Sequence, residues 1–191
     1  RAIRREHTLR VLRLARELGA PSMQTEPGGP LQEGQTWHDA ANVFYEELMP
    51  CVEYAEQQGV DLLIEPEPGL LIETFEQYLE FSGRVDSPAL GLNFDIGHAF
   101  CMRQEPQDWI PQMAPHTRHY HIEDIAANRR HAHLVPGEGA IDFAAVLRAI
   151  LATGYQGWVT VELYPYVEDP DTAGRRAKDH LHTVFERMSE A

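Results

Sequence analysis

The sequence predicts an α/β fold built from parallel βα units. Short apolar runs alternate along the chain with longer segments in which apolar residues recur at helical spacing. Each apolar run ends in a polar residue, so each predicted strand carries a polar side chain at its C-terminal end. Strands and helices that alternate at this spacing are typical of a sheet of parallel βα units.

Six helices are predicted from apolar periodicity and from end signals. Gly19 and Gly59 are expected to stop the first two helices, Asp142 is placed as an N-cap, and Gly154 is placed as a stop. Pro50 is expected to bend the second helix. The predicted helices are residues 1–18, 37–58, 73–81, 107–114, 142–153 and 172–188.

Five strands are predicted between these helices. They are residues 20–25, 61–65, 90–95, 118–122 and 158–163. Five parallel strands fit either an open α/β sheet or a barrel whose first three units are absent, and 191 residues fall short of the roughly 250 of a complete eight-unit barrel.

Four of the strands end in residues that can bind a metal: Glu65, Asp95, His121 and Glu162. Any one of them alone could be a charge that faces solvent or pairs with an arginine. Carboxylates gathered at one mouth of a barrel would repel one another, and a divalent cation removes that repulsion. Recurrence on four consecutive strands therefore favours a metal site, and oxygen ligands with one imidazole favour Mn²⁺, Mg²⁺ or Co²⁺.

A family resemblance rests on five motifs that occur in order. They are Ile64-Glu65-Pro66, Phe94-Asp95-Ile96-Gly97-His98, His121-Ile122-Glu123-Asp124, residues 133–143 and Val161-Glu162-Leu163. Together they resemble the last four strand motifs of the xylose-isomerase-like sugar isomerases and epimerases, which include D-tagatose 3-epimerase-like proteins. The resemblance implies one TIM-barrel domain over residues 1–191, truncated at its N-terminus so that the last five of eight βα units are present.

The resemblance also assigns roles to individual residues. It implies one catalytic metal held by Glu65, Asp95, His121 and Glu162, with Mn²⁺ expected and Co²⁺, Mg²⁺ or Zn²⁺ as alternatives. Glu65 and Glu162 are the implied pair of acid and base catalysts.

Three further residues are expected to contact the substrate. His98 is implied to bind a hydroxyl, and His133 matches a histidine that the family places near the site. An arginine that follows the metal-binding histidine grips the substrate in the family's epimerases, and we favour Arg129 over Arg130 for this role.

The expected function is therefore a metal-dependent isomerase or epimerase of a small keto sugar or related polyol, acting through a cis-enediolate. Dehydration of a keto-inositol uses the same chemistry and stays open. The alternatives are an apurinic-site endonuclease-like metal hydrolase, which uses three zinc ions, and a non-catalytic remnant of a barrel.

Bulk properties bear on the expected partners. A formal net charge of −14 disfavours nucleic acid, because phosphate binding relies on Lys and Arg. No apolar run reaches the roughly 18 residues of a membrane span.

Cys51 and Cys101 are expected to be reduced thiols, so we expect a cytoplasmic protein. It is also expected to form a homo-oligomer that covers open sheet edges.

Overall fold

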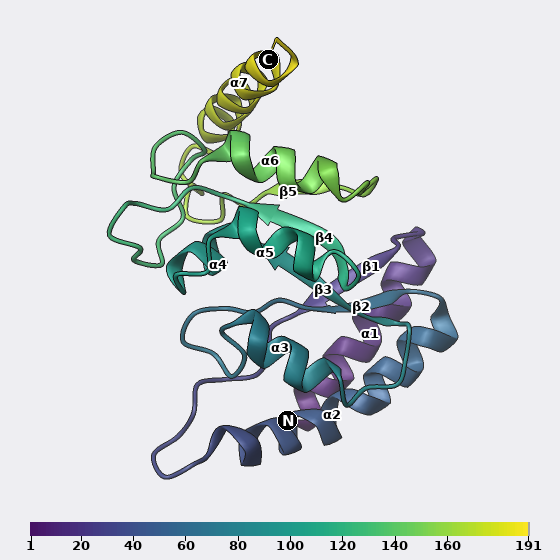
Figure 1. Ribbon diagram of the computed structural model, residues 1–191. Coiled ribbons are helices and arrows are strands. Elements are labelled where there is room, and N and C mark those ends of the chain that lie inside the picture. Colours follow the sequence, from purple (N-terminus) through teal and green to yellow (C-terminus); the bar gives the residue numbers. More distant parts are fainter. Residues whose placement is uncertain (191) are drawn as a thin grey trace. The chain divides into compact units, whose positions relative to one another are not determined.

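The computed structural model describes residues 1–190, and strands alternate with helices along them (Figure 1). The elements are α1 (Ala2–Leu18), β1 (Ser22–Thr25), α2 (Trp37–Gln58), β2 (Asp61–Ile64), α3 (Phe75–Ser82), β3 (Leu90–Asp95), α4 (Ile96–Cys101), α5 (Pro106–Met113), β4 (Thr117–Ile122), α6 (Phe143–Ala152), β5 (Val159–Val161) and α7 (Pro170–Ser189). All five predicted strands and all six predicted helices are present, with ends shifted by a few residues.

The chain divides into two compact units. The first comprises residues 1–94 and 116–118, and the second comprises residues 95–115 and the described residues from 119 onward. The division passes through β3 after Phe94 and through β4 after Arg118. Most of the predicted polar strand-end residues therefore lie in the second unit.

In the first unit, β1, β2 and β3 follow one another in a parallel sheet. Leu62, Leu63 and Ile64 of β2 are fully buried, as expected for a parallel strand that is covered on both faces. α1 and α2 pack against each other, and α1 also packs on β1 (Figure 1). Both helices end, as predicted, at glycines in the left-handed conformation, Gly19 with φ 71° and Gly59 with φ 64°.

In the second unit, β4 and β5 are parallel neighbours, with Tyr120 opposite Val159 and Ile122 opposite Val161. α5 packs on α6, and α6 packs on α7. Asp142 caps α6 as predicted, because its carboxylate accepts a hydrogen bond of 3.0 Å from the Ala145 N–H.

Two local predictions differ from the structure. The last strand is shorter than expected and covers only Val159–Val161, and Trp158, which was placed in it, is 78% exposed. The helix α4 was not predicted, because six residues are too few to show helical periodicity. It starts directly after β3, where the Asp95 carboxylate accepts a hydrogen bond from the His98 N–H at 2.7 Å.

No helix among residues 1–190 is both long and apolar enough to cross a membrane.

Candidate metal centre

Asp95 is the last residue of β3 and the N-cap of α4. One carboxylate oxygen, Oδ1, accepts the hydrogen bond from the His98 N–H. The other, Oδ2, is buried and accepts no hydrogen bond from a donor among the described residues. A buried carboxylate oxygen that accepts no hydrogen bond keeps a lone pair free to bind a metal ion, and Oδ2 of Asp95 is such an atom.

His121 and Glu162 come from the two strands of the second unit. Nδ1 of His121 lies 3.4 Å from Oε2 of Glu162, and the Glu162 N–H donates to the carbonyl of Ile122 at 3.0 Å. The parallel register pairs His121 with Thr160, so Glu162 follows just beyond the end of β5. The ligand atoms of Asp95, His121 and Glu162 all lie within 4.8 Å of one another. The second unit thus brings together three of the four predicted metal ligands.

Glu65, the fourth predicted ligand, belongs to the first unit. It follows β2 directly, is only 6% exposed, and its N–H donates to the carbonyl of Thr25 at 3.4 Å. Its position is the one predicted, at the C-terminal end of a buried parallel strand.

The charges around these residues favour their ionised forms. A hydrogen bond from His121 lowers the pKa of Glu162 against the opposing effect of burial. Burial raises the pKa of Asp95, but the charges of His98 and His121, together with the hydrogen bonds, bring its pKa below the ordinary value. Ionised carboxylates are the form that binds a cation.

A second cluster lies beside these ligands and contains the predicted residues His98 and His133. His98 and His133 are 5% and 4% exposed, and Nε2 of His133 lies 3.1 Å from Nε2 of His131. Glu123 is fully buried, with Oε1 3.9 Å from the same Nε2 of His133. Burial lowers the pKa of His131 to about 4 and also lowers that of His133, so both rings are neutral at neutral pH.

Sequence reasoning gave no role to His131 or Glu123. The spacing His131-Ala132-His133 was a signal that could have been used, since it places two imidazoles two residues apart in an extended segment. Glu123 lies two residues after His121 within a quoted motif, but only the fold shows that its carboxyl is buried.

The loop that carries His131 and His133 is held by Asp124. Its carboxylate accepts backbone hydrogen bonds from Ile125, Gly137, Gly139 and Ile141 at 2.8–3.1 Å. Backbone bonds in both directions between Asp124 and Leu134 close the loop. A side chain at residue 139 would overlap with the Asp124 carboxylate, so the glycine there is required by close approach.

Arg129 is also in this loop, in a left-handed conformation with φ 60°. Its guanidinium donates to the carbonyl of Phe100 at 2.8 Å, lies 3.9 Å from the centroid of the Phe100 ring and pairs with Glu105. The structure therefore places Arg129 against the end of α4 and the start of α5.

The donor set fits the divalent metal that the sequence analysis expects. Two carboxylates and one imidazole within 4.8 Å, with Oδ2 of Asp95 buried and without a donor, form an oxygen-rich site for a hard or borderline cation.

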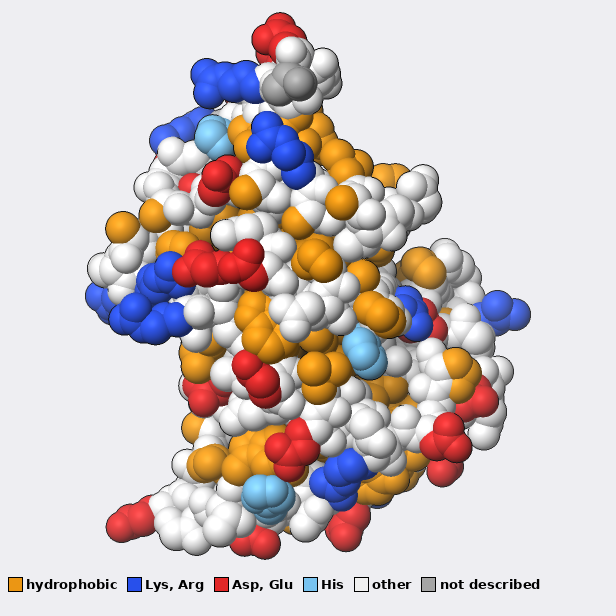
Figure 2. Space-filling view, in the orientation of Figure 1, with side chains coloured by type: hydrophobic (Ala, Val, Ile, Leu, Met, Phe, Trp, Pro, Cys, Tyr) orange, Lys and Arg blue, Asp and Glu red, His pale blue; other side chains and the backbone are white. Residues whose placement is uncertain are grey.

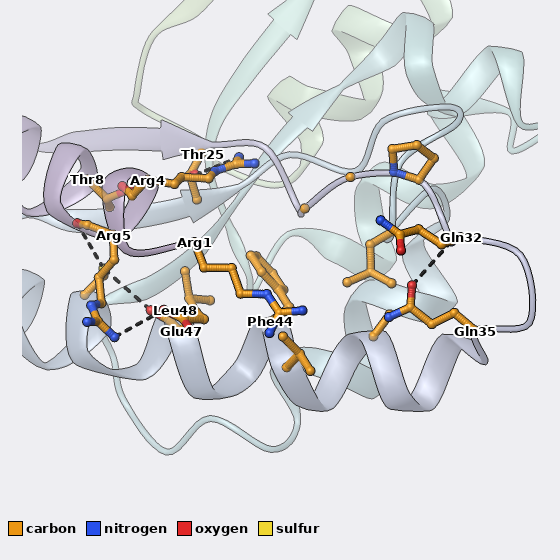
Figure 3. A pocket seen from close by; sticks show the side chains of 17 residues that line it. Arg1, Arg4, Arg5, Thr8, Thr25, Gln32, Gln35, Phe44, Glu47 and Leu48 are labelled. Atoms are coloured by element: carbon orange, nitrogen blue, oxygen red, sulfur yellow. Dashed lines mark hydrogen bonds and ion pairs between the residues drawn. The ribbon is translucent and has the colours of Figure 1, made fainter.

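A cavity of about 320 Å³ in the first unit contains none of the predicted site residues (Figure 3). Arg1, Arg4 and Arg5 reach into it from the start of α1, opposite Phe44 and Glu47 of α2. Arg5 pairs with Glu47 at 3.2 Å, so part of its charged lining is already neutralised.

The face in Figure 2 carries Lys and Arg side chains in separate groups with Asp and Glu side chains between them. A protein that binds the phosphate backbone of a nucleic acid usually carries a continuous stripe of Lys and Arg. The face in Figure 2 does not show such a stripe.

The family model described as a xylose isomerase-like TIM barrel matches residues 1–184. The chain belongs to this family. The match confirms the resemblance drawn from the strand-end motifs, and it confirms the fold class, in which the five parallel βα units are part of a TIM barrel.

Two curated proteins illustrate the family. The chain is 29% identical over 145 residues to fructoselysine 3-epimerase of Escherichia coli O157:H7, covering 73% of this chain and 52% of that protein. It is 23% identical over 180 residues to inosose dehydratase of Clostridium beijerinckii, covering 84% of this chain and 60% of that protein. The chain thus spans a little more than half the length of these relatives.

Solved structures agree on the fold. A D-tagatose 3-epimerase-like protein is 27% identical, with a TM-score of 0.80 over 94% of this chain and 68% of that one. The IOLI protein, solved with a bound zinc atom, is 24% identical, with a TM-score of 0.80 over 96% of this chain and 69% of that one.

Proposed function

We propose that this chain carries the metal-dependent active site of an isomerase or epimerase that acts on a small keto sugar or related polyol. The observation that carries the proposal is the convergence of Asp95, His121 and Glu162 within 4.8 Å in a member of the xylose isomerase-like family. Epimerases and a dehydratase of sugar-like substrates among its relatives support the substrate class.

One divalent cation is proposed to bind Asp95, His121 and Glu162, with Glu65 as the fourth ligand. The position of Glu65 after a buried parallel strand supports its inclusion. We propose Mn²⁺, because carboxylate-rich sites favour hard cations, although a related protein holds zinc. When bound, the cation supplies positive charge that stabilises negative charge developing on the substrate's carbonyl oxygen.

Glu65 and Glu162 are proposed to move the proton next to the carbonyl. One carboxylate removes the proton from the carbon, and the other returns a proton after the substrate has rearranged. The lowered pKa of Glu162 supports the first role, because a base must be ionised at the working pH.

Substrate hydroxyls are proposed to contact His98, Arg129 and His133. Burial of His98 and His133 supports this, because an imidazole offers the substrate two ring nitrogens that can form hydrogen bonds. Phe100 and Glu105 hold Arg129, so we propose that, besides its contact with the substrate, Arg129 keeps α4, and with it His98, in place.

Proton exchange into deuterated solvent tests the reaction. The purified chain, loaded with Mn²⁺ or Co²⁺, is incubated with a panel of ketoses, and deuterium at the carbon next to the carbonyl is followed by NMR. We expect exchange with at least one ketose, and none after Glu162→Gln. No exchange with any ketose would refute the proposal and favour a non-catalytic remnant.

Dehydration is a second candidate, favoured by the inosose dehydratase relative. It begins with the same proton removal but expels a hydroxyl group. A keto-inositol substrate would then yield a product lighter by one water, which mass spectrometry detects.

We also propose that the two units belong to one domain, that the chain forms a homo-oligomer and that it works in the cytoplasm. The two cysteines are both free thiols, which suits a reducing compartment. Light scattering of the purified chain measures its oligomeric state.

A further inference from the structure

His119 lies on β4, two residues before the proposed metal ligand His121. Side chains two positions apart on a strand point to the same side of the sheet. The ring centroids of His119 and His121 are 5.3 Å apart, and the two ring planes meet at 86°. This is the edge-to-face arrangement, in which the edge of one ring contacts the face of the other.

The neighbouring strand β5 holds the ring of His119. Nε2 of His119 lies 2.8 Å from Oγ1 of Thr160, which is a hydrogen-bond distance. Thr160 is the register partner of His121, and Glu162 follows it by two residues. Nδ1 of His121 lies 3.4 Å from Oε2 of Glu162. β4 and β5 thus form two contacts in successive layers, a hydrogen bond and, next to it, a pair of proposed metal ligands.

We propose that His119 is a positioning residue for the metal site. Its ring, held by the hydrogen bond with Thr160, fixes the ring of His121 so that Nδ1 faces Glu162 before any ion binds. The inference rests on the proposed site of Asp95, His121 and Glu162, the carboxylate site, and adds to it a residue that the proposed reaction does not use.

His119 is placed to act through His121 instead of on the ion. Among residues 1–190, several groups of His, Asp and Glu bring possible ligand atoms within 4.8 Å of one another, and His121 belongs to one of these groups. His119 belongs to none of them. One of its two ring nitrogens is also engaged with Thr160.

The orientation of a metal-binding imidazole affects how well it binds. Outer partners that orient such rings typically contribute about 10- to 100-fold to metal affinity. A ring contact is weaker than a direct hydrogen bond to the ligand, so we expect a value near the lower end. An ordinary cross-strand pair of His119 and Thr160 would stabilise the sheet without any effect on His121. The experiments below separate these two cases.

Calorimetric titration of the full chain with Mn²⁺ tests the role of the ring. His119→Ala removes the ring and should weaken binding about tenfold. His119→Phe keeps a ring but loses the hydrogen bond, so it should recover most of the affinity and remain about threefold weaker than the wild type. The matched control is the exposed His182, and His182→Ala should bind normally. Unchanged affinity in His119→Ala would overturn the proposal.

Thr160→Val removes the same hydrogen bond from the other strand. It should also weaken Mn²⁺ binding about threefold, and Thr183→Val, an exposed change in α7, should have no effect. If the hydrogen bond acts as one unit, the double variant His119→Phe/Thr160→Val should again be about threefold weaker. Independent effects would multiply to roughly ninefold, and that result would contradict the proposal.

NMR of the ring nitrogens of His121 in the metal-free chain gives a measurement that does not depend on the ion. We expect the His121 signals to shift in His119→Ala, while those of His182 stay in place. If His119→Ala does not fold, His119→Phe and Thr160→Val serve for the same comparison, since Thr160 is exposed. Unchanged His121 signals in a folded variant would overturn the positioning role.

The outcomes distinguish this inference from the proposed function. Equal Mn²⁺ affinity in the wild type and His119→Ala, together with deuterium exchange, would overturn the role of His119 and leave the reaction standing. Weaker binding by His119→Ala, without exchange in the wild type, would refute only the reaction. A wild type that binds no Mn²⁺ would overturn both.

Discussion

Nδ1 of His121 lies 3.4 Å from Oε2 of Glu162, across the parallel pair β4 and β5. Neither residue is near the other in sequence, and the register of two strands brings them together. The pair is therefore a product of the fold, and Glu162 is the member whose change can be measured as a loss of metal affinity.

Glu162→Gln should weaken metal binding at the carboxylate site by at least about tenfold, because an amide oxygen carries no charge and is a poorer ligand. Turnover should be lost as well. Calorimetric titration with Mn²⁺ measures the affinity. Glu168→Gln, which alters an exposed carboxylate nearby in sequence, is the control and should bind Mn²⁺ normally. Normal binding by both variants would remove Glu162 from the site.

Gly97→Ala should destabilise the chain by about 2–3 kcal/mol, because its Cβ would overlap with the buried Glu123 carboxylate. The matched change is Gly174→Ala in α7, where a Cβ meets nothing within 4 Å. That change should stabilise the chain by up to about 1 kcal/mol. Urea unfolding measures both free energies, and a neutral Gly97→Ala would show that Glu123 can move aside.

Asp124→Ala should cost about 3 kcal/mol, because four backbone N–H groups lose a charged acceptor. Asp142→Ala, which removes only the N-cap of α6, should cost about 1 kcal/mol. Hydrogen exchange should show that the amides of Gly137 and Gly139 lose protection in Asp124→Ala alone. Equal losses in both variants would contradict the organising role of Asp124.

Arg129→Ala should lower stability by about 2 kcal/mol, because it removes a charged hydrogen bond to Phe100 and the contact of the guanidinium with its ring. Arg130 is exposed, and Arg130→Ala should change stability by less than about 0.5 kcal/mol. Unchanged stability in Arg129→Ala, together with a raised KM, would instead support direct substrate binding.

Cys101 should react slowly with iodoacetamide at pH 8. Burial, followed by the charge of Asp95, raises the pKa of its thiol to about 11. A free thiol with a pKa of about 8.5 has on the order of 100-fold more thiolate at pH 8. The alkylation rate, measured with Cys51→Ser, should therefore still rise about tenfold per pH unit between pH 8 and 10. A rate that levels off near pH 8.5 would contradict this pKa. Mn²⁺ bound at Asp95 should accelerate the reaction, because it offsets the negative charge that raises the pKa of Cys101.

The sequence was sufficient to predict the α/β fold and the strand-end positions of Glu65, Asp95, His121 and Glu162. Apolar runs and helical periodicity reflect which side chains must be buried, and that requirement is local enough to be visible along the chain. The glycine stops after α1 and α2 and the Asp142 cap were predictable for the same reason, because caps act within a few residues.

Only the tertiary structure revealed the short helix α4 and the position of His131 beside His98 and His133. The Asp95 side chain caps α4, and Gly97 leaves room for the Glu123 carboxyl beside this helix. Neither feature produces a periodic pattern that six residues could show. Likewise, His131 joins His98 and His133 only because Asp124 folds the loop after β4 back on itself. Contacts between residues far apart in sequence depend on strand register and loop closure, and these are properties of the packed chain as a whole.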